Sequence, residues 1–264
     1  DNNITINLAY GVRAKSTWVE FDEDTTKSVT VPDTFRFGVV KNTNTSTLYT
    51  SFSSAISAAS TNNVLDVWAW TYNENVVINK GITLVGNSTA TSIINGGSGD
   101  YAIEVKSSGV TIKNLTLNGA SDSLLYAGNY NTLTVENVVM SSSSSNYGIY
   151  FDRTKQSTIT SVTVNDTDRK SVYITDGDTI TFKDSSFMNA SSSHGFEISD
   201  SEEIILDNVF IYNSGYNGSS SYGLYITGSD KITVQNSTKV GGSKSYELYA
   251  NEVSSLKIYN STFV

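Results

Sequence analysis

The sequence predicts an all-β solenoid, a parallel β-helix of about eight to nine rungs. Three observations support this fold class. From Gly81 to its last residue the chain repeats itself about every 24 residues. Each repeat contains short alternating runs rich in Val, Ile, Thr, Phe and Tyr, broken by Ser, Asn, Asp and Gly. No segment between repeats is long and apolar enough at helical spacing to form a crossover helix.

The repeats align on one column of apolar residues. The second apolar residue of each repeat marks it: Leu84, Ile112, Val135, Ile159, Phe182, Leu206, Val234 and Ile258. Successive marks are 23, 24 or 28 residues apart. A period in the low twenties with two or three short strands describes one turn of a β-helix, and the framework of a leucine-rich repeat is absent. We expect all of these side chains to be buried in one line.

Other columns follow from the same alignment. Two residues after the mark, five repeats carry an asparagine: Asn114, Asn137, Asn208, Asn236 and Asn260. Asn tolerates the left-handed backbone of a sharp corner, and its amide can bond to the asparagine of the next rung. A second inward pair follows, such as Leu115 and Leu117, and Lys239 interrupts it, which predicts a bend or a shift in the seventh rung. Another pair, such as Ile103 and Val105, opens each rung.

The segment before the repeats differs from them. We expect residues 1–46 to form an N-terminal β arm or module and residues 47–264 to form the parallel β-helix. The run FSSAISAA from Phe52 predicts a short helix between these parts. The strand VLDVWAW from Val64 and the run ENVVINKGITLVG from Glu74 follow it.

This opening stretch resembles a known family. The runs SFSSAISAAS, VLDVWAWTYNENVVINKGITLVG and TSIINGG are similar to the start of pectate-lyase-like, right-handed parallel β-helix proteins. The later rungs resemble the repeats of NosD-like and archaeal surface β-helix proteins. The resemblance implies a right-handed solenoid whose N-terminal end is plugged by the short helix. It implies no single function, because this fold hosts lyases, hydrolases, esterases and proteins without activity.

Composition excludes several classes of function. The chain has no cysteine and one histidine, so we expect no disulfide framework, no metal site and no cofactor. The net charge of −9 argues against nucleic acid and anionic membranes as partners. No run is apolar for the roughly 18 residues of a membrane span. The chain begins at Asp1 without a basic and apolar leader, and we expect a secreted or cell-surface protein.

One outward column is unusual. The middle of the strand that opens each rung is occupied by tyrosine or glutamate: Glu104, Tyr126, Tyr150, Tyr173, Glu197, Tyr225 and Tyr249. Smaller residues precede it, namely Ala102, Gly148, Ser171, Gly195 and Gly223, which predicts a shallow trough beside the column. Such a row is suited to contact with sugar rings. The alternative is that tyrosine simply favours strands and stacks on itself in any solenoid.

Catalysis has one candidate cluster, comprising Asp152, Arg153, Arg169, Lys170, Tyr173, His194 and Glu197. A β-elimination could use Arg169 or Lys170 to acidify a proton and His194 or Tyr173 to remove it. Hydrolysis could use Asp152 with Glu197. No sequence motif marks either pair, so the sequence favours a protein that is not an enzyme.

The sequence also indicates where the protein could be glycosylated and how it could assemble. Among nine sequons, those at Asn165, Asn189 and Asn217 are expected to lie in loops and to carry any glycan. The last rung ends without a predicted cap, and an alternating arm lies at the other end of the chain. The residues expected at such a head-to-tail contact are Ile4, Ile6, Leu8, Leu248, Leu256, Ile258 and Phe263.

The sequence leaves two functions open. The sequence favours an extracellular structural or adhesive protein that assembles into a homo-oligomer or filament through its ends. The alternative is a polysaccharide-binding or polysaccharide-degrading protein, a lyase or glycoside hydrolase, that uses the column of tyrosines and glutamates.

Overall fold

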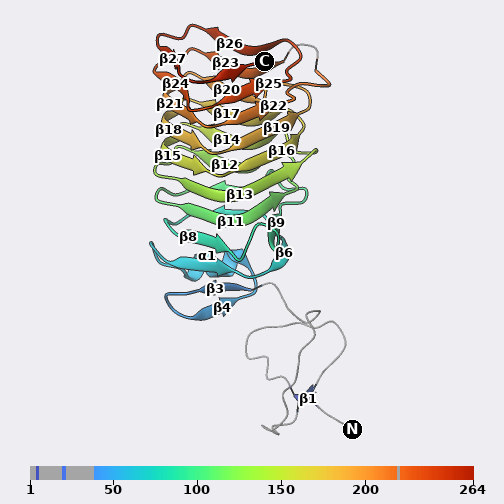
Figure 1. Ribbon diagram of the computed structural model, residues 1–264. Coiled ribbons are helices and arrows are strands. Elements are labelled where there is room, and N and C mark those ends of the chain that lie inside the picture. Colours follow the sequence, from blue (N-terminus) through green and yellow to red (C-terminus); the bar gives the residue numbers. More distant parts are fainter. Residues whose placement is uncertain (1–3, 6–19, 22–38, 219–220) are drawn as a thin grey trace.

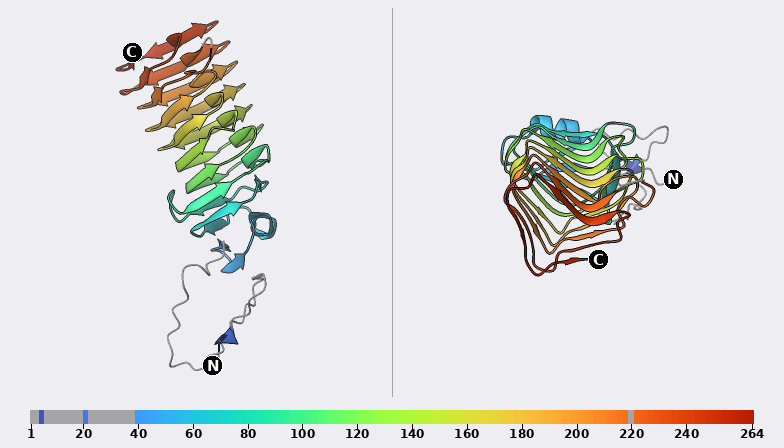
Figure 2. Two further views of the ribbon diagram at one scale, coloured as in Figure 1. Left: turned by 90° about the vertical axis from the view of Figure 1, so that its right-hand side faces the viewer. Right: turned by 90° about the horizontal axis from the view of Figure 1, so that it is seen from above.

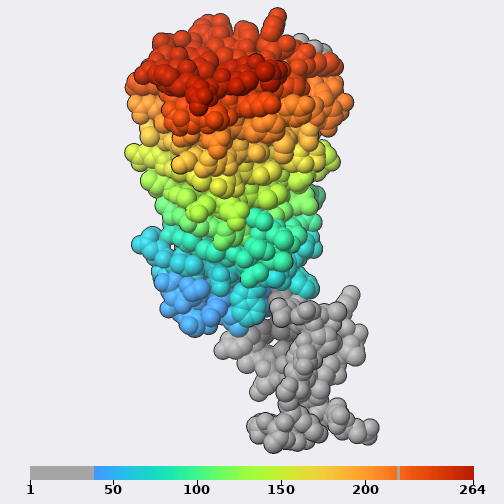
Figure 3. All heavy atoms as spheres, in the orientation of Figure 1, coloured from blue at the N-terminus to red at the C-terminus, as the bar shows by residue number. Residues whose placement is uncertain are grey.

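The chain forms a right-handed parallel β-helix of about eight turns (Figure 1). The computed structural model describes residues 4–5, 20–21, 39–218 and 221–264. Successive turns stack as bands from the first turn to the last, both in the ribbon and in the space-filling view of Figure 3. Seen from above, successive turns repeat the same outline, each displaced slightly from the one before it (Figure 2). The predicted all-β solenoid is thereby confirmed.

Three faces surround the core. The first face is the eight-stranded sheet, with strands β7 (Val76–Ile78), β10 (Tyr101–Val105), β12 (Ser123–Gly128), β14 (Tyr147–Asp152), β17 (Lys170–Thr175), β20 (Phe196–Ser199), β23 (Tyr222–Thr227) and β26 (Tyr246–Asn251). The second face holds β5 (Val64–Val67), β8 (Thr83–Gly86), β15 (Lys155–Thr160), β18 (Asp178–Lys183), β21 (Glu202–Asp207), β24 (Ile232–Gln235) and β27 (Leu256–Ile258). The third holds β6 (Trp70–Asn73), β9 (Ser92–Asn95), β16 (Thr163–Thr167), β19 (Ser186–Ala190), β22 (Phe210–Tyr212), β25 (Lys239–Gly241) and β28 (Thr262–Phe263). Strands β11 (Thr111–Asn118) and β13 (Thr134–Ser142) run through both of these faces.

The first turn is closed by the predicted helix, α1 (Phe52–Ala58), which buries Phe52, Ala55 and Ile56. The Glu74 carboxylate accepts the backbone N–H groups of Phe52 and Ser53, both at 3.0 Å, where a helix N-terminus favours an anion. At the other end Lys80 Nζ donates to the carbonyl oxygen of residue 59 at 2.7 Å. No helix among the described residues is long and apolar enough to cross a membrane.

Three antiparallel pairings lie at the N-terminal end of the described chain. Strand β3 (Val40–Asn42) pairs with β4 (Thr47–Tyr49) and also with β5 of the second face. The expected domain boundary at residues 46 and 47 therefore falls inside a hairpin that is joined to the solenoid. Near the start of the chain, β1 (Ile4–Thr5) pairs with β2 (Glu20–Phe21). The remainder of the expected arm, including Ile6 and Leu8, lies outside the described residues.

The core columns follow the predicted alignment. Consecutive marks pair in register, and Ile112, Val135, Ile159, Phe182, Leu206 and Val234 are fully buried. The prediction for Ile258 is wrong, because this residue lies in the last described turn and is 41% exposed. At Lys239 the predicted irregularity is a shift of one residue. Lys239 points outward, and Thr238 and Val240 take the buried positions of the column.

The predicted asparagine corner is confirmed by the backbone. Asn114, Asn137 and Asn208 have φ values of 55°, 50° and 54°, in the left-handed region that asparagine tolerates. The amide of Asn137 donates to that of Asn114 at 2.9 Å. Where aspartate replaces asparagine, at Asp184, its carboxylate accepts the Asn208 amide at 2.7 Å. The corner therefore fixes where each turn leaves the second face.

Candidate functional site

The column of tyrosines and glutamates lies on the outer side of the eight-stranded sheet. Parallel pairing places Glu104, Tyr126, Tyr150, Tyr173, Glu197, Tyr225 and Tyr249 opposite one another in consecutive strands. Strand pairing spaces neighbouring members by roughly 4.8 Å. The column therefore runs continuously from β10 to β26, almost the full length of the solenoid (Figure 1).

The predicted trough beside this column is wrong. Ala102 and Ser171 are fully buried, and the glycines of this row pack inward at the corner of the turn. A side chain at Gly148 would lie 2.2 Å from Val164 and 2.6 Å from the carbonyl oxygen of Ser171. The residues of this row are small because they pack against the third face. They therefore form no groove on the surface.

A second outward column takes the place of the trough. The positions three residues before each member of the first column are Tyr101, Ser123, Tyr147, Lys170, His194, Tyr222 and Tyr246. The five aromatic members are at least partly exposed, whereas Ser123 and Lys170 are buried. Sequence reasoning missed this column because it assumed strict alternation through the corner. The recurrence of aromatic residues three positions before the first column was the signal that could have found it.

The two columns together form two groups of aromatic rings, which we call the aromatic strip. The first group is Tyr101, Tyr126, Tyr147, Tyr150 and Tyr173, and the second is His194, Tyr222, Tyr225, Tyr246 and Tyr249. Ring centroids of Tyr150 and Tyr173 lie 5.0 Å apart, with planes 20° from parallel. Tyr225 and Tyr249 stack at the same distance with planes 4° apart. Because the rings cover one another's faces along the axis, they leave mainly their edges exposed. The hydroxyl group of Tyr126 lies along its strand, over Gly128.

Several tyrosines of the strip have raised pKa values. Burial, with smaller contributions from nearby carboxylates and tyrosines, raises the pKa of both Tyr101 and Tyr150 to about 12. Burial is also the main cause that raises the pKa values of Tyr126, Tyr173 and Tyr225. A neutral phenol both donates and accepts hydrogen bonds. The strip therefore offers a row of neutral hydroxyl groups at neutral pH.

A compact polar cluster separates the two aromatic groups. Lys170 Nζ lies 2.8 Å from Glu197 Oε2, and each of these side chains is only 11% exposed. The same ammonium group lies 4.0 Å from the centre of the Tyr173 ring, a cation–π distance. His194 Nε2 lies 3.6 Å from the Glu197 carboxylate. The structure thus brings together four of the seven residues of the predicted catalytic cluster.

His194 is held in one neutral form. Its Nδ1 accepts the backbone N–H of Tyr222 at 3.2 Å, so the ring proton lies on Nε2 and faces Glu197. Burial lowers the pKa of His194 below its ordinary value, against the opposing effect of Glu197. The ring stacks on Tyr225 at 4.5 Å with planes 9° apart. In this arrangement His194 serves as part of the aromatic strip.

The other predicted catalytic residues lie apart from this cluster. Arg153 pairs with Asp152 at 2.6 Å. Asp152 on β14 and Glu197 on β20 are two strands apart, and each already binds its own cation. Arg169 is exposed, and its guanidinium carbon lies 5.8 Å from the centre of the Tyr147 ring. The structure therefore does not bring Asp152 and Glu197 together as a pair.

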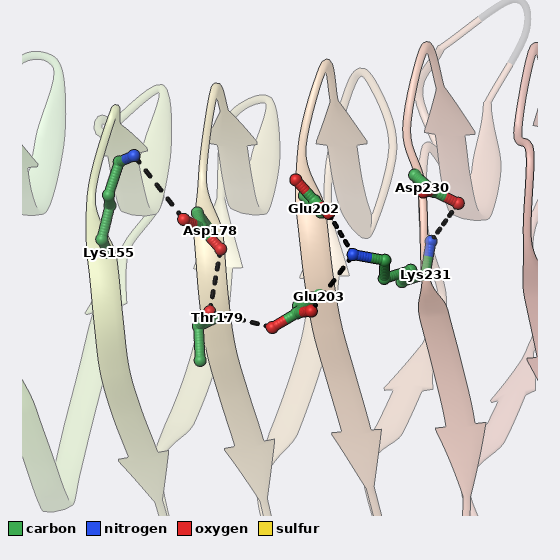
Figure 4. A network of polar contacts seen from close by, with 7 residues as sticks. All are labelled: Lys155, Asp178, Thr179, Glu202, Glu203, Asp230 and Lys231. Atoms are coloured by element: carbon green, nitrogen blue, oxygen red, sulfur yellow. Dashed lines mark hydrogen bonds and ion pairs between the residues drawn. The ribbon is translucent and has the colours of Figure 1, made fainter.

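A second polar network lies on the second face, around β18, β21 and β24 (Figure 4). Lys155 pairs with Asp178 at 3.5 Å, and Lys231 bonds to both Glu202 and Glu203. These groups are about half exposed, and such exposed pairs contribute little to stability. Among the described residues no group of three or more His, Cys, Asp or Glu side chains could hold a metal ion. We therefore assign no binding or metal site to this network.

Two of the predicted glycosylation sites lie in strands instead of loops. Asn165 belongs to β16 and Asn189 to β19, where the Asn189 amide donates to Asn165 Oδ1 at 2.7 Å. Asn213 continues this ladder by donating to Asn189 Oδ1 at 2.6 Å. The expectation failed because Asn189 and Asn213, with φ values of 57° and 56°, form a second stacked corner of the solenoid, and Asn165 bonds to it from the preceding turn. Asn217 is exposed in a turn, as predicted, and glycosylation there stays a prediction.

The residues expected at a head-to-tail contact are partly described. Leu248, Leu256 and Phe263 are half-buried in the last turn and pack against the core. Ile4 lies in β1. Assembly through these residues stays a prediction.

Comparisons with known proteins identify the fold family. A family model described as right handed beta helix region matches residues 48–209 and 147–264. Comparison with curated proteins gave no match. Among solved structures, the enzymatically active domain of tailspike protein 2 of bacteriophage CBA120 is 11% identical, with a TM-score of 0.59, over 80% of this chain and 40% of that chain. The A-module of mannuronan C-5 epimerase from Azotobacter vinelandii is 16% identical, with a TM-score of 0.54, over 75% and 66%.

A third structure, a pectate lyase, is 14% identical, with a TM-score of 0.50, over 81% of this chain and 73% of that chain. The match to the tailspike domain covers only 40% of that domain, so this chain spans well under two thirds of its length. At these identities the likeness establishes the fold alone.

Proposed function

We propose that this chain, which belongs to the right-handed β-helix family, binds an extended polysaccharide along its aromatic strip. The observation that carries the proposal is the register of the strip, which repeats an aromatic ring on the outer side of each turn from β10 to β26. An extended sugar chain is also a linear repeat of hydroxyl groups and apolar ring faces. An extended sugar chain that lies along the solenoid axis would therefore meet matching groups of the strip at regular intervals.

The chemistry of the strip fits sugars in two ways. The neutral phenols of Tyr126, Tyr150 and Tyr173 can donate to sugar hydroxyls and accept from them. The more exposed rings, such as Tyr246 at 66%, offer apolar surface to the C–H faces of a sugar ring. Because strand pairing fixes these groups, little conformational entropy is lost when a ligand binds.

The fold neighbours support this function over the structural role that the sequence favoured. Two of them are named for action on polymers of acidic sugars, pectate and mannuronan. An extracellular or cell-surface location, where polysaccharides are found, is part of the proposal. Binding is proposed without catalysis, because the ion pairs Arg153–Asp152 and Lys170–Glu197 already occupy most of the charged groups considered for catalysis.

The test removes two neighbouring rings of the first group. Tyr150→Ala combined with Tyr173→Ala is expected to reduce retention on immobilised polysaccharides by about tenfold or more, since truncation of a central aromatic contact costs about 2 kcal/mol. Retention is measured by affinity electrophoresis across a panel of polysaccharides. Tyr212→Ala is the matched control, because Tyr212 is 46% exposed on the third face, away from the strip.

Folding of the double variant is checked by circular dichroism. Equal retention of the folded double variant and the wild type on every polymer that binds would show that the tyrosines only stabilise the solenoid.

A further inference from the structure

We infer that the polysaccharide held by the aromatic strip is an uncharged polymer of neutral hexoses and not a polyuronate. This inference rests on the proposed function and specifies its ligand class. It comes from the electrostatics of the strip, and it differs from what the names of the pectate and mannuronan enzymes would suggest for this chain.

The basic side chains along the strip are mostly paired. Three ion pairs lie on the eight-stranded sheet or at its edge: Lys106–Glu104 at 2.9 Å, Arg153–Asp152 at 2.6 Å and Lys170–Glu197 at 2.8 Å. The third pair lies between the two aromatic groups and is almost entirely buried. A sugar carboxylate could recruit one of these cations only by displacing its protein partner and leaving that carboxylate without a cation.

The charges that remain are predominantly negative. Arg169 has no ion pair among the described residues and leans on Tyr147, with its Nη1 3.4 Å from the phenol oxygen. Against it, the carboxylates of Asp122 and Asp200 lie beside the strip and have no ion pair among the described residues. After burial, they are among the smaller causes that raise the pKa values of Tyr101 and Tyr173. The whole chain carries a net charge of −9. The field along the strip therefore opposes a polyanion.

A polyuronate places a carboxylate on every sugar, so it needs a cation at a corresponding spacing along the sheet. The strip instead presents neutral hydroxyl groups and ring edges at that spacing. A neutral hexose polymer can satisfy these groups without removing any ion from its partner or from water. The strip is therefore complementary to uncharged sugars.

The first part of the test compares ligand classes with the unmodified protein. Retention is measured on hydroxyethylcellulose and galactomannan as neutral polymers, and on pectate and alginate as polyuronates, at low and at moderate salt. We expect retention on at least one neutral polymer, unchanged by salt within about twofold, and no retention on the polyuronates. Retention on pectate or alginate that salt abolishes, without retention on neutral polymers, would overturn the ligand class and leave the proposed function intact.

The second part converts the strip into a polyanion-binding surface. Glu104→Gln with Asp152→Asn releases Lys106 and Arg153 from their pairs, and it should raise retention on pectate at low salt at least threefold. Glu136→Gln with Glu202→Gln is the matched control, since it makes the same change of net charge on the second face by releasing Lys113 and one bond to Lys231. We expect no such gain from the control.

An equal gain by both double variants would contradict the inference, because net charge and not the strip would then govern exclusion of polyuronates. If no neutral or acidic polymer retained the wild-type protein, the proposed function would fail together with the ligand class.

Discussion

Replacing Phe182 by alanine is expected to lower the free energy of unfolding by about 3–5 kcal/mol. Phe182 is fully buried in β18. Its ring centre lies 4.9 Å from that of Phe196 and 5.7 Å from that of Phe187, both with nearly perpendicular planes. Phe151 lies 6.4 Å away on the other side. Removing the ring would leave a cavity in which three aromatic side chains lose contacts, and the rigid turns above and below cannot collapse to fill it.

Urea denaturation followed by circular dichroism measures this loss. Phe210→Ala is the matched control, because Phe210 is only partly buried on the outer side of β22, where it stacks on Tyr212. We expect the control to cost less than half as much. A loss below about 1 kcal/mol for Phe182→Ala would contradict the burial of this column.

Glu197→Ala is expected to lower the free energy of unfolding by about 2–4 kcal/mol. The substitution leaves the Lys170 ammonium group with no carboxylate partner in a site where it is 11% exposed. Desolvation of an unpaired ion is costly, and the contact with the Tyr173 ring offsets only part of it. The same denaturation experiment applies, repeated at high salt to confirm that the effect persists in a buried site.

The double variant Lys170→Met with Glu197→Leu is the control for this effect. It removes both charges and keeps most of the side-chain volume, and replacing a buried ion pair by apolar groups is often close to neutral. We expect it to be more stable than Glu197→Ala alone. If the two variants lose equal stability, the penalty arises from packing and not from the unpaired ammonium group.

The fold could be predicted from the sequence because each turn repeats the same physical requirements. Buried marks such as Val135 and Ile159 must be apolar, and corners such as Asn114 must tolerate a left-handed backbone. Both requirements make the same residue types recur once per turn in the sequence. The errors occurred at the corners, where successive side chains no longer alternate between inward and outward positions. Lys239 seemed to interrupt a column only because the preceding corner had shifted the register by one residue.

The site was predicted only in part for the same reason. The first column, from Glu104 to Tyr249, follows simple alternation within a strand and was found. The second column includes Tyr147 and His194 and lies beyond the corner, where two successive residues change direction. The pairing of Lys170 with Glu197 joins residues of two turns in different columns, and no spacing within one repeat indicates such a contact.

The most direct test of polysaccharide binding by the strip observes the tyrosines themselves. The chain has 16 tyrosines, which can be labelled with carbon-13 in their rings and assigned by substitution. On addition of a soluble neutral hexose oligosaccharide, the account predicts chemical-shift changes at Tyr126, Tyr150 and Tyr173. Tyr212 and Tyr259 are exposed away from the strip and should stay unchanged. Shifts confined to Tyr212 and Tyr259, or no shift at any tyrosine under saturating oligosaccharide, would contradict the account.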